Sequence, residues 1–195
     1  MSFFENTRKP VGFGGKLMVA MMNLGHTPMA CWGLRFLKLA PNANVLDCGC
    51  GGGANIKRLL KKCPRGSVKG LDYSPVSVEK SKKVNQTAIA EGRCTVLQGS
   101  VAELPFKTEE FDGVTAFETV YFWPDILQSF QEVYRVLKPG GTFFICNESN
   151  GDTDKDEKWT EIIGGMTIYK DAELKAYLEQ AGFHDVRIHK KKSWL

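Results

Sequence analysis

The sequence predicts an α/β protein in which helices cover both faces of a mostly parallel β-sheet, the doubly wound arrangement. Between residues 43 and 190, short apolar segments of strand length alternate with longer segments whose apolar residues recur at helical spacing. Turns rich in glycine and proline separate these segments. The chain has 195 residues, 43% of them hydrophobic, which is enough for one domain with its own buried core.

The predicted strands are short apolar runs that end at turn residues. They are residues 44–48, 67–71, 93–98, 111–117, 142–147 and 183–189. The first ends beside Asp47 and the second ends just before Asp72, so each of these two strands delivers a carboxylate to its carboxyl end.

The predicted helices lie between these strands. Residues 54–63 form the first, because Ile56, Leu59 and Leu60 share one helical face. Ser74-Pro75 opens a long second helix, with serine as N-cap and proline at the first helical position. A third helix follows Trp123-Pro124 and is ended sharply by Lys138-Pro139-Gly140-Gly141.

A fourth helix begins at Asp171 as cap and ends at Gly182. Two segments stand outside the alternation. Residues 1–42 contain a glycine-rich stretch, several methionines and a helix opened by Thr27-Pro28, and we expect them to form a helical lid on a core of residues 43–195 within a single domain. Residues 148–170 are polar, and we expect a loop there.

Charge and composition exclude several classes of function. The net charge is only +4, and the lysine clusters are more typical of solvated helix faces than of a nucleic-acid interface. No apolar run approaches the ~18 residues that span a bilayer, and no secretory leader is evident. Six scattered cysteines without paired spacing indicate reduced thiols. We therefore expect a cytoplasmic protein with neither a nucleic-acid nor a membrane partner.

No metal-ligand set is evident in the sequence. The cysteines lack zinc spacing. The acids at Asp152, Asp154 and Asp156 suggest a calcium loop, but Glu157 stands where such a loop needs glycine, and Ile163 stands where it needs glutamate. We expect a solvated acidic loop instead.

The most informative segment is the strand, turn and helix start around residues 45–60. Four glycines follow Asp47 within six residues. Glycines permit a tight turn and let a ligand approach the backbone, and the helix start adds unpaired N–H groups and a positive dipole end. An acid beside such a turn suits a ligand that carries an ammonium group next to a nucleoside.

Four segments in this order resemble the class I, Rossmann-like S-adenosylmethionine-dependent methyltransferases, particularly the branch that acts on small metabolites. They are residues 47–53 (DCGCGGG), 70–74 (GLDYS), 99–106 (GSVAELPF) followed by Phe111-Asp112, and 132–141 (EVYRVLKPGG). The resemblance implies the strand order 3-2-1-4-5-7-6, with the seventh strand antiparallel. Residues 192–195 stand where that strand should only be starting, so we expect it to be truncated or absent.

The resemblance also implies S-adenosylmethionine as cofactor and assigns it a set of residues. Asp47 lies near the methionine ammonium group, Asp72 binds the ribose hydroxyls, and Tyr73 lies against the adenine. The other residues expected along the cofactor are Gly49, Cys50, Gly51, Gly53, Ser100, Val101, Phe117 and Glu118.

The acceptor is expected beyond the carboxyl ends of the fourth and fifth strands. Glu118 and Tyr121 follow the fourth strand, and an acid beside an aromatic ring suits a flat or cationic molecule. His26, in the lid, is the candidate general base because its ordinary pKa is near neutrality. Methyl transfer from a sulfonium needs mainly positioning, so we predict an enzyme that methylates a small-molecule acceptor by in-line displacement.

Two alternatives remain open. Gly49, Gly51 and Ala54 fit the dinucleotide pattern GxGxxA, with Asp72 as the distant acid, so a nicotinamide-dependent oxidoreductase is one. Against it, Asp47 beside the turn would repel a pyrophosphate. The other alternative is a non-catalytic protein that binds S-adenosylmethionine.

Overall fold

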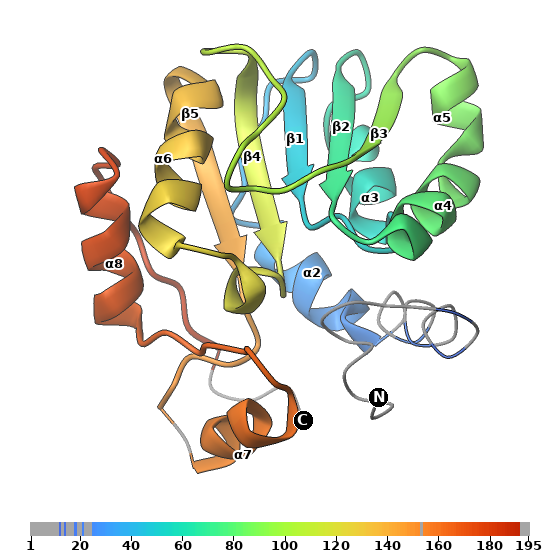
Figure 1. Ribbon diagram of the computed structural model, residues 1–195. Coiled ribbons are helices and arrows are strands. Elements are labelled where there is room, and N and C mark those ends of the chain that lie inside the picture. The colour runs from blue at the N-terminus through green and yellow to red at the C-terminus, as the bar shows by residue number, and fades with distance from the viewer. Residues whose placement is uncertain are drawn as a thin grey trace.

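The computed structural model describes residues 25–152 and 154–191, together with residues 12, 14, 18 and 21. Its centre is a five-stranded sheet in the order β3-β2-β1-β4-β5, in which every neighbouring pair is parallel. The strands are β1 (Asn44–Cys48), β2 (Ser67–Asp72), β3 (Cys94–Gln98), β4 (Phe111–Phe117) and β5 (Leu137–Cys146). Because all five are parallel, their carboxyl ends share one edge of the sheet, where α2 (Thr27–Gly33) lies (Figure 1).

Each face of the sheet is covered by helices, which confirms the predicted doubly wound α/β class. Val45 of β1 contributes to one hydrophobic cluster and Leu46 to the other, because successive side chains of a strand point to opposite faces. The first cluster contains side chains of α2, α3 (Ala54–Lys62) and α4 (Pro75–Val84), and part of α5 (Gln86–Ala90) packs against it. The second contains side chains of α6 (Ile126–Val136), with α8 (Asp171–Gln180) packed against it.

The helix that follows β2 begins as the sequence predicts but is shorter. Ser74 is the N-cap of α4, its hydroxyl accepts a hydrogen bond from Ser77 N at 3.4 Å, and Pro75 is the first helical residue. The predicted long helix is divided at Asn85 into α4 and α5. The Asn85 side-chain amide donates to Ser81 O and to Gly53 O, both at 3.0 Å, and such bonds compete with a regular helical backbone.

Strand β5 begins five residues earlier than predicted. The segment Lys138-Pro139-Gly140-Gly141 ends α6, as expected, but it lies within the strand rather than before it. Phe111 pairs with Leu137 and Gly113 pairs with Thr142, so the register shifts there, and Gly140 has a φ of +76°. A proline is tolerated at such an irregularity in the outer strand of the described sheet.

Two predictions near the C-terminus are wrong. Residues 183–189 do not form a strand. In the implied strand order the sixth strand pairs with the seventh, no described residue forms a seventh, and residues 192–195 lie outside the described residues. Part of the expected loop at 148–170 is instead α7 (Asp154–Ile162), whose start is rich in the acids that favour a first helical turn and which is followed by the buried Ile163.

The remaining elements agree more closely with expectation. Helix α8 starts at Asp171, with Lys170 rather than Asp171 as N-cap. A short 3-10 helix, η2 (Val120–Phe122), follows β4. Of the predicted lid, most of residues 1–24 lies outside the described residues, so the lid remains a prediction. No helix in the described ranges combines the length and apolar character needed to cross a membrane.

Candidate functional site

The glycine turn after β1 is fixed to the neighbouring strand by its backbone. Gly49 N and Cys50 N both donate to Leu71 O, at 2.8 and 3.0 Å. Gly49, Gly51 and Gly53 have φ values of +70°, +51° and +79°, the left-handed region that favours glycine. This agrees with the prediction that the turn needs glycines for its conformation.

The three glycines differ in what a Cβ atom would meet. At Gly49 it would lie 2.0 Å from Thr119 Oγ1, and at Gly53 it would lie 2.4 Å from Ser81 Oγ. At Gly51 no atom lies within 4 Å of that position. Packing within the protein therefore requires glycine at 49 and 53, whereas Gly51 presents a bare backbone to open space.

Asp72, at the end of β2, faces this turn. Its side chain is buried, Oδ2 accepts a hydrogen bond from Gly51 N at 2.9 Å, and Oδ1 accepts one from Ser74 N at 2.9 Å. Burial raises its pKa above the ordinary value, and these backbone donors oppose the shift. Each carboxylate oxygen can accept two hydrogen bonds, so Asp72 retains capacity for hydroxyl groups of a ligand.

Asp47 is the second buried carboxyl group at this edge. Thr115 Oγ1, on the adjacent β4, donates to Asp47 Oδ1 at 2.7 Å. Desolvation raises the pKa of Asp47 to about 7, and the nearby charge of Asp72 adds to the effect. A cationic group placed beside Asp47 would favour its ionised form.

The other residues expected along the cofactor divide into accessible and buried ones. Tyr73 is 40% exposed and Ser100 is exposed, so both can meet a ligand directly. Val101 and Phe117 are buried in the two hydrophobic clusters. The Cys50 thiol is also buried, 3.9 Å from Ser81 Oγ, and the Cys50 N–H donates to Leu71 O. The Cys50 carbonyl oxygen accepts from Gly53 N and keeps a second lone pair for a ligand.

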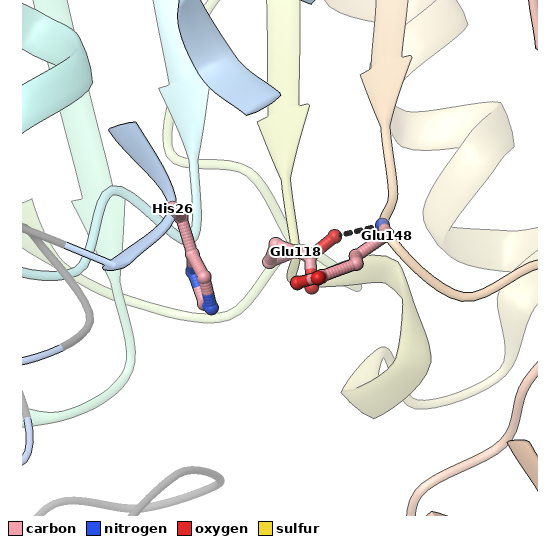
Figure 2. Close-up of side chains that lie close together, drawn as sticks. All are labelled: His26, Glu118 and Glu148. Atoms are coloured by element: carbon pink, nitrogen blue, oxygen red, sulfur yellow. Dashed lines mark hydrogen bonds between the residues drawn. The ribbon is translucent and has the colours of Figure 1, made fainter. Parts of the chain in front are cut away.

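A second group of polar side chains lies farther along the same edge. His26, directly before α2, Glu118, directly after β4, and Glu148, two residues after β5, face one another (Figure 2). One potential ligating atom from each lies within 4.8 Å of the other two. His26 and Glu118 were predicted as site residues, and Glu148 was not. Its position just after a strand, at the carboxyl edge, is the feature of the sequence that could have identified it.

Glu118 is held in place by its neighbours. It has a φ of +57°, its backbone N–H donates to Cys146 O at 3.0 Å, and its Oε1 accepts a hydrogen bond from Glu148 N. Burial raises the pKa of Glu118 to about 8, and the charge of Glu148 contributes to this. Burial lowers the pKa of His26, whereas the charge of Glu148 opposes the shift, so the neutral form of the imidazole is favoured.

Tyr121 supports this group from within the protein. Its side chain is buried, and its hydroxyl accepts a hydrogen bond from Ser149 N at 2.9 Å. The single hydroxyl proton can be donated to Ser149 O, at 3.1 Å, or to Glu118 Oε1, at 3.4 Å. Tyr121 therefore ties the segment after β5 to Glu118. Trp123, two residues later, packs within the protein against Phe130 and Phe143.

Asn147 is a further residue that the sequence interpretation missed. Its Oδ1 is buried and has no hydrogen-bond partner among the described residues. Leaving such an acceptor unpaired costs roughly 1–3 kcal/mol. Because Asn147 directly follows β5 at the carboxyl edge, a donor on a bound ligand would relieve that cost.

Together these features define a class of protein. A parallel sheet wound with helices on both faces, with acids at the ends of two central strands and an open glycine between them, is the arrangement of a nucleoside-binding α/β protein. The family described as "Methyltransferase domain" matches residues 46–145. The chain belongs to this family, which confirms the predicted resemblance to the class I S-adenosylmethionine-dependent methyltransferases.

Individual relatives agree with this assignment. The chain is 32% identical to cycloartenol-C-24-methyltransferase of Arabidopsis thaliana over 75% of its own length and 46% of that protein. It is 40% identical to demethylmenaquinone methyltransferase of Lactiplantibacillus plantarum over 58% of its own length and 48% of that protein. The chain thus spans less than half the length of these two curated relatives.

Solved structures give the same result for the fold. A chain of the Haloferax volcanii complex that contains the Trm112 methyltransferase activator is 28% identical, with a TM-score of 0.80 over 86% of this chain and 73% of that one. The S-adenosylmethionine-dependent methyltransferase of Aquifex aeolicus is 20% identical, with a TM-score of 0.73 over 88% and 90% of the two chains. The second likeness is one of fold alone.

Proposed function

We propose that this chain is an enzyme that transfers the methyl group of S-adenosylmethionine to a small-molecule acceptor. The observation that carries the proposal is the position of Gly51, whose backbone faces open space beside Asp72 in the turn that follows Asp47. The family to which the chain belongs supports the same cofactor.

Each part of the cofactor has a suitable group at this edge. Asp47 would bind the methionine ammonium group, and Asp72 would accept hydrogen bonds from the ribose hydroxyls. Tyr73 and Ser100 are accessible to the adenine. Holding donor and acceptor in line supplies much of the rate in such a reaction, up to roughly 7–11 kcal/mol in favourable cases.

The acceptor would lie beside His26 and Glu118. The Tyr121 hydroxyl, 3.4 Å from Glu118 Oε1, would help to hold the Glu118 side chain in place. A neutral imidazole can accept a proton, so His26 is the candidate general base where the acceptor must lose one. Relatives named for a sterol and for a quinone precursor support an organic small molecule as acceptor.

The alternatives can be weighed against the same geometry. A nicotinamide dinucleotide would bring its pyrophosphate near Asp47 and raise the pKa of this carboxyl group further, whereas the ammonium group of S-adenosylmethionine would favour its ionised form. A non-catalytic binding protein would need the cofactor site alone. The convergence of His26, Glu118 and Glu148 farther along the edge favours an enzyme.

The cytoplasmic location also remains a proposal. All six cysteines are free, and five of them are buried. Thiols without disulfide partners are typical of proteins in a reducing compartment.

Calorimetry with S-adenosylmethionine, S-adenosylhomocysteine and NAD tests the cofactor assignment. We expect the first two to bind and NAD not to bind. Gly51→Ala should weaken S-adenosylmethionine binding at least tenfold, because its methyl group would enter the ligand space. Gly92→Ala is the matched control, since Gly92 also has a positive φ (+71°) and open space but lies before β3 at the opposite edge.

Both substitutions place alanine in the left-handed region, so each should cost about 1–2 kcal/mol of folding stability. Equal effects of the two on cofactor binding, or tight NAD binding without S-adenosylmethionine binding, would overturn the proposal. Mass spectrometry of a metabolite mixture incubated with methyl-labelled cofactor then separates an enzyme from a binding protein, because only an enzyme gives a labelled product.

A further inference from the structure

Three potential metal ligands converge from segments that are far apart in the sequence. An imidazole nitrogen of His26 and one carboxylate oxygen each from Glu118 and Glu148 lie within 4.8 Å of one another (Figure 2). We propose that these three residues form a binding site for a divalent transition-metal ion.

The distances suit such an ion after the ligands move closer together. Zinc binds nitrogen and oxygen ligands at about 2.0–2.2 Å in tetrahedral geometry, so two ligands on the same ion are roughly 3.3–3.6 Å apart. Ligand atoms that lie within 4.8 Å of one another therefore have to approach by at most about 1.5 Å. Glu148 can make this movement because its side chain is exposed.

Electrostatics favour a cation at this point. Glu118 and Glu148 bring two carboxylates together, and in the described part of the chain no ion pair joins either of them to a lysine or arginine. A divalent cation between the two carboxyl groups would attract both of them and would favour the ionised form of each.

The surrounding hydrogen bonds orient the ligands. Oε1 of Glu118 accepts from Glu148 N, and Tyr121 lies 3.4 Å away as a second donor. These bonds use Oε1 and leave Oε2 for an ion. Metal-binding carboxylates are commonly held by outer hydrogen bonds of this kind. His26 is positioned by the start of α2, where its carbonyl oxygen accepts from Ala30 N at 3.0 Å.

The ligand types indicate the class of metal. One imidazole with two carboxylates suits Zn²⁺, Mn²⁺, Fe²⁺ or Co²⁺, whereas Ca²⁺ and Mg²⁺ prefer oxygen ligands alone. Three protein ligands leave at least one coordination position open. If the proposed function holds, an oxygen atom of the acceptor can occupy that position, where the cation would favour its ionised form. With the ion bound, the His26 nitrogen that binds it no longer accepts a proton, so the cation would take the place of a general base. The metal site itself does not depend on that step.

Calorimetry on the full chain without an affinity tag tests the site, with Zn²⁺, Mn²⁺ and Mg²⁺ as separate probes. We expect one Zn²⁺ or Mn²⁺ to bind per chain, and Mg²⁺ to bind at least tenfold more weakly. His26→Ala and Glu148→Gln should each weaken Zn²⁺ binding at least tenfold. With Co²⁺, the visible absorption spectrum of the bound ion should change in His26→Ala, because a nitrogen ligand is lost.

Two substitutions at exposed positions away from the three residues serve as controls. His184→Ala and Glu91→Gln remove the same chemical groups and should leave Zn²⁺ binding unchanged. Urea unfolding of each variant establishes that it is folded. No Zn²⁺ or Mn²⁺ binding, or equal losses in the site and control variants, would overturn the proposal.

The result is separable from the proposed function. S-adenosylmethionine binding in Glu148→Gln should equal that of the unaltered chain, because Glu148 is not among the residues assigned to the cofactor. Metal binding without any binding of S-adenosylmethionine would refute the proposed function and leave the metal site standing.

Discussion

Asp47 and Asp72 are both buried carboxyl groups at the carboxyl ends of adjacent strands, yet their partners differ. Asp72 accepts hydrogen bonds from two backbone N–H groups and so links the turns after β1 and β2. Asp47 accepts one from the Thr115 hydroxyl. Removing the Asp72 side chain would therefore leave two backbone N–H groups without that acceptor. Among the described residues, Asp47 accepts from no backbone group, so its carboxylate is available to interact with a cationic part of a ligand. Burial of the charged form of Asp47 costs free energy in the absence of that ligand.

That cost gives a prediction for stability. The pKa of Asp47 is raised from 3.8 to about 7, so the folded state retains a proton that the unfolded state releases between these values. Its contribution to stability is complete below pH 3.8 and is lost as the pH rises through 7. Asp47→Asn does not ionise, so we expect it to stabilise the ligand-free protein by about 2–4 kcal/mol at pH 8, and much less at pH 4.5.

Urea unfolding of both proteins at the two pH values measures this difference. Asp112→Asn is the control with the opposite sign, because Lys138 lies 2.7 Å from Asp112 and lowers its pKa. It should destabilise the protein at pH 8. A gain for Asp47→Asn that does not depend on pH would contradict the assigned cause.

Among the elements, the break between α4 and α5 connects most directly to the cofactor turn. Asn85 is buried, and its amide group donates to the carbonyl of Gly53, the last residue of the turn before α3. One side chain thus supports both the end of α4 and the backbone that carries Gly51.

We expect Asn85→Ala to lower the free energy of unfolding by about 1–3 kcal/mol, because two carbonyl groups lose a buried donor. Binding of S-adenosylmethionine should weaken as well, since the turn loses a support. Gln86→Ala, at the next and exposed position, should change neither quantity. Urea unfolding and calorimetry measure both effects, and equal behaviour of the two variants would contradict the role of Asn85.

The same elements illustrate what the sequence can predict. Ser74-Pro75 determines the start of α4 through local capping, so the sequence predicted it correctly. The division at Asn85 depends on a contact with Gly53, 32 residues away, and the irregularity at Pro139 depends on pairing with β4. Local patterns do not contain such contacts. For the same reason, residues 183–189 have a strand-like composition but do not form a strand in the described structure.

At the scale of the whole molecule, the site depends on topology. Asp47 and Asp72 were predictable because each lies at the carboxyl end of its own strand and the two strands are neighbours. The meeting of His26 with Glu148 was not, because it requires α2 to lie at the end of a sheet whose fifth strand comes more than a hundred residues later (Figure 1). The core that holds this arrangement consists of the two hydrophobic clusters on the faces of the sheet.

A substitution in that core should therefore lower stability without changing the site. Phe130 of α6 is fully buried and contacts Trp123 and Phe143. We expect Phe130→Ala to cost about 3–5 kcal/mol. Lys175→Ala, which removes an exposed ion pair with Glu179, should cost less than about 0.5 kcal/mol.

Urea unfolding measures both values. At temperatures where Phe130→Ala is still folded, its affinity for S-adenosylmethionine should equal that of the unaltered chain. A large loss of affinity in the folded variant would mean that this cluster shapes the cofactor site directly.

Because the five strands are parallel, their carboxyl ends form one rim of the molecule and their amino ends form the other. The sequences of the two rims can change to different degrees during evolution. Every residue proposed to meet a ligand belongs to the rim near α2, whereas the connections at 64–66 and 91–93 lie on the other (Figure 1). Insertions at exposed connections of this kind are well tolerated. Proteins that evolve from such a chain can therefore have longer or different loops at these connections, or further segments inserted there, without a change in the residues that meet the ligand.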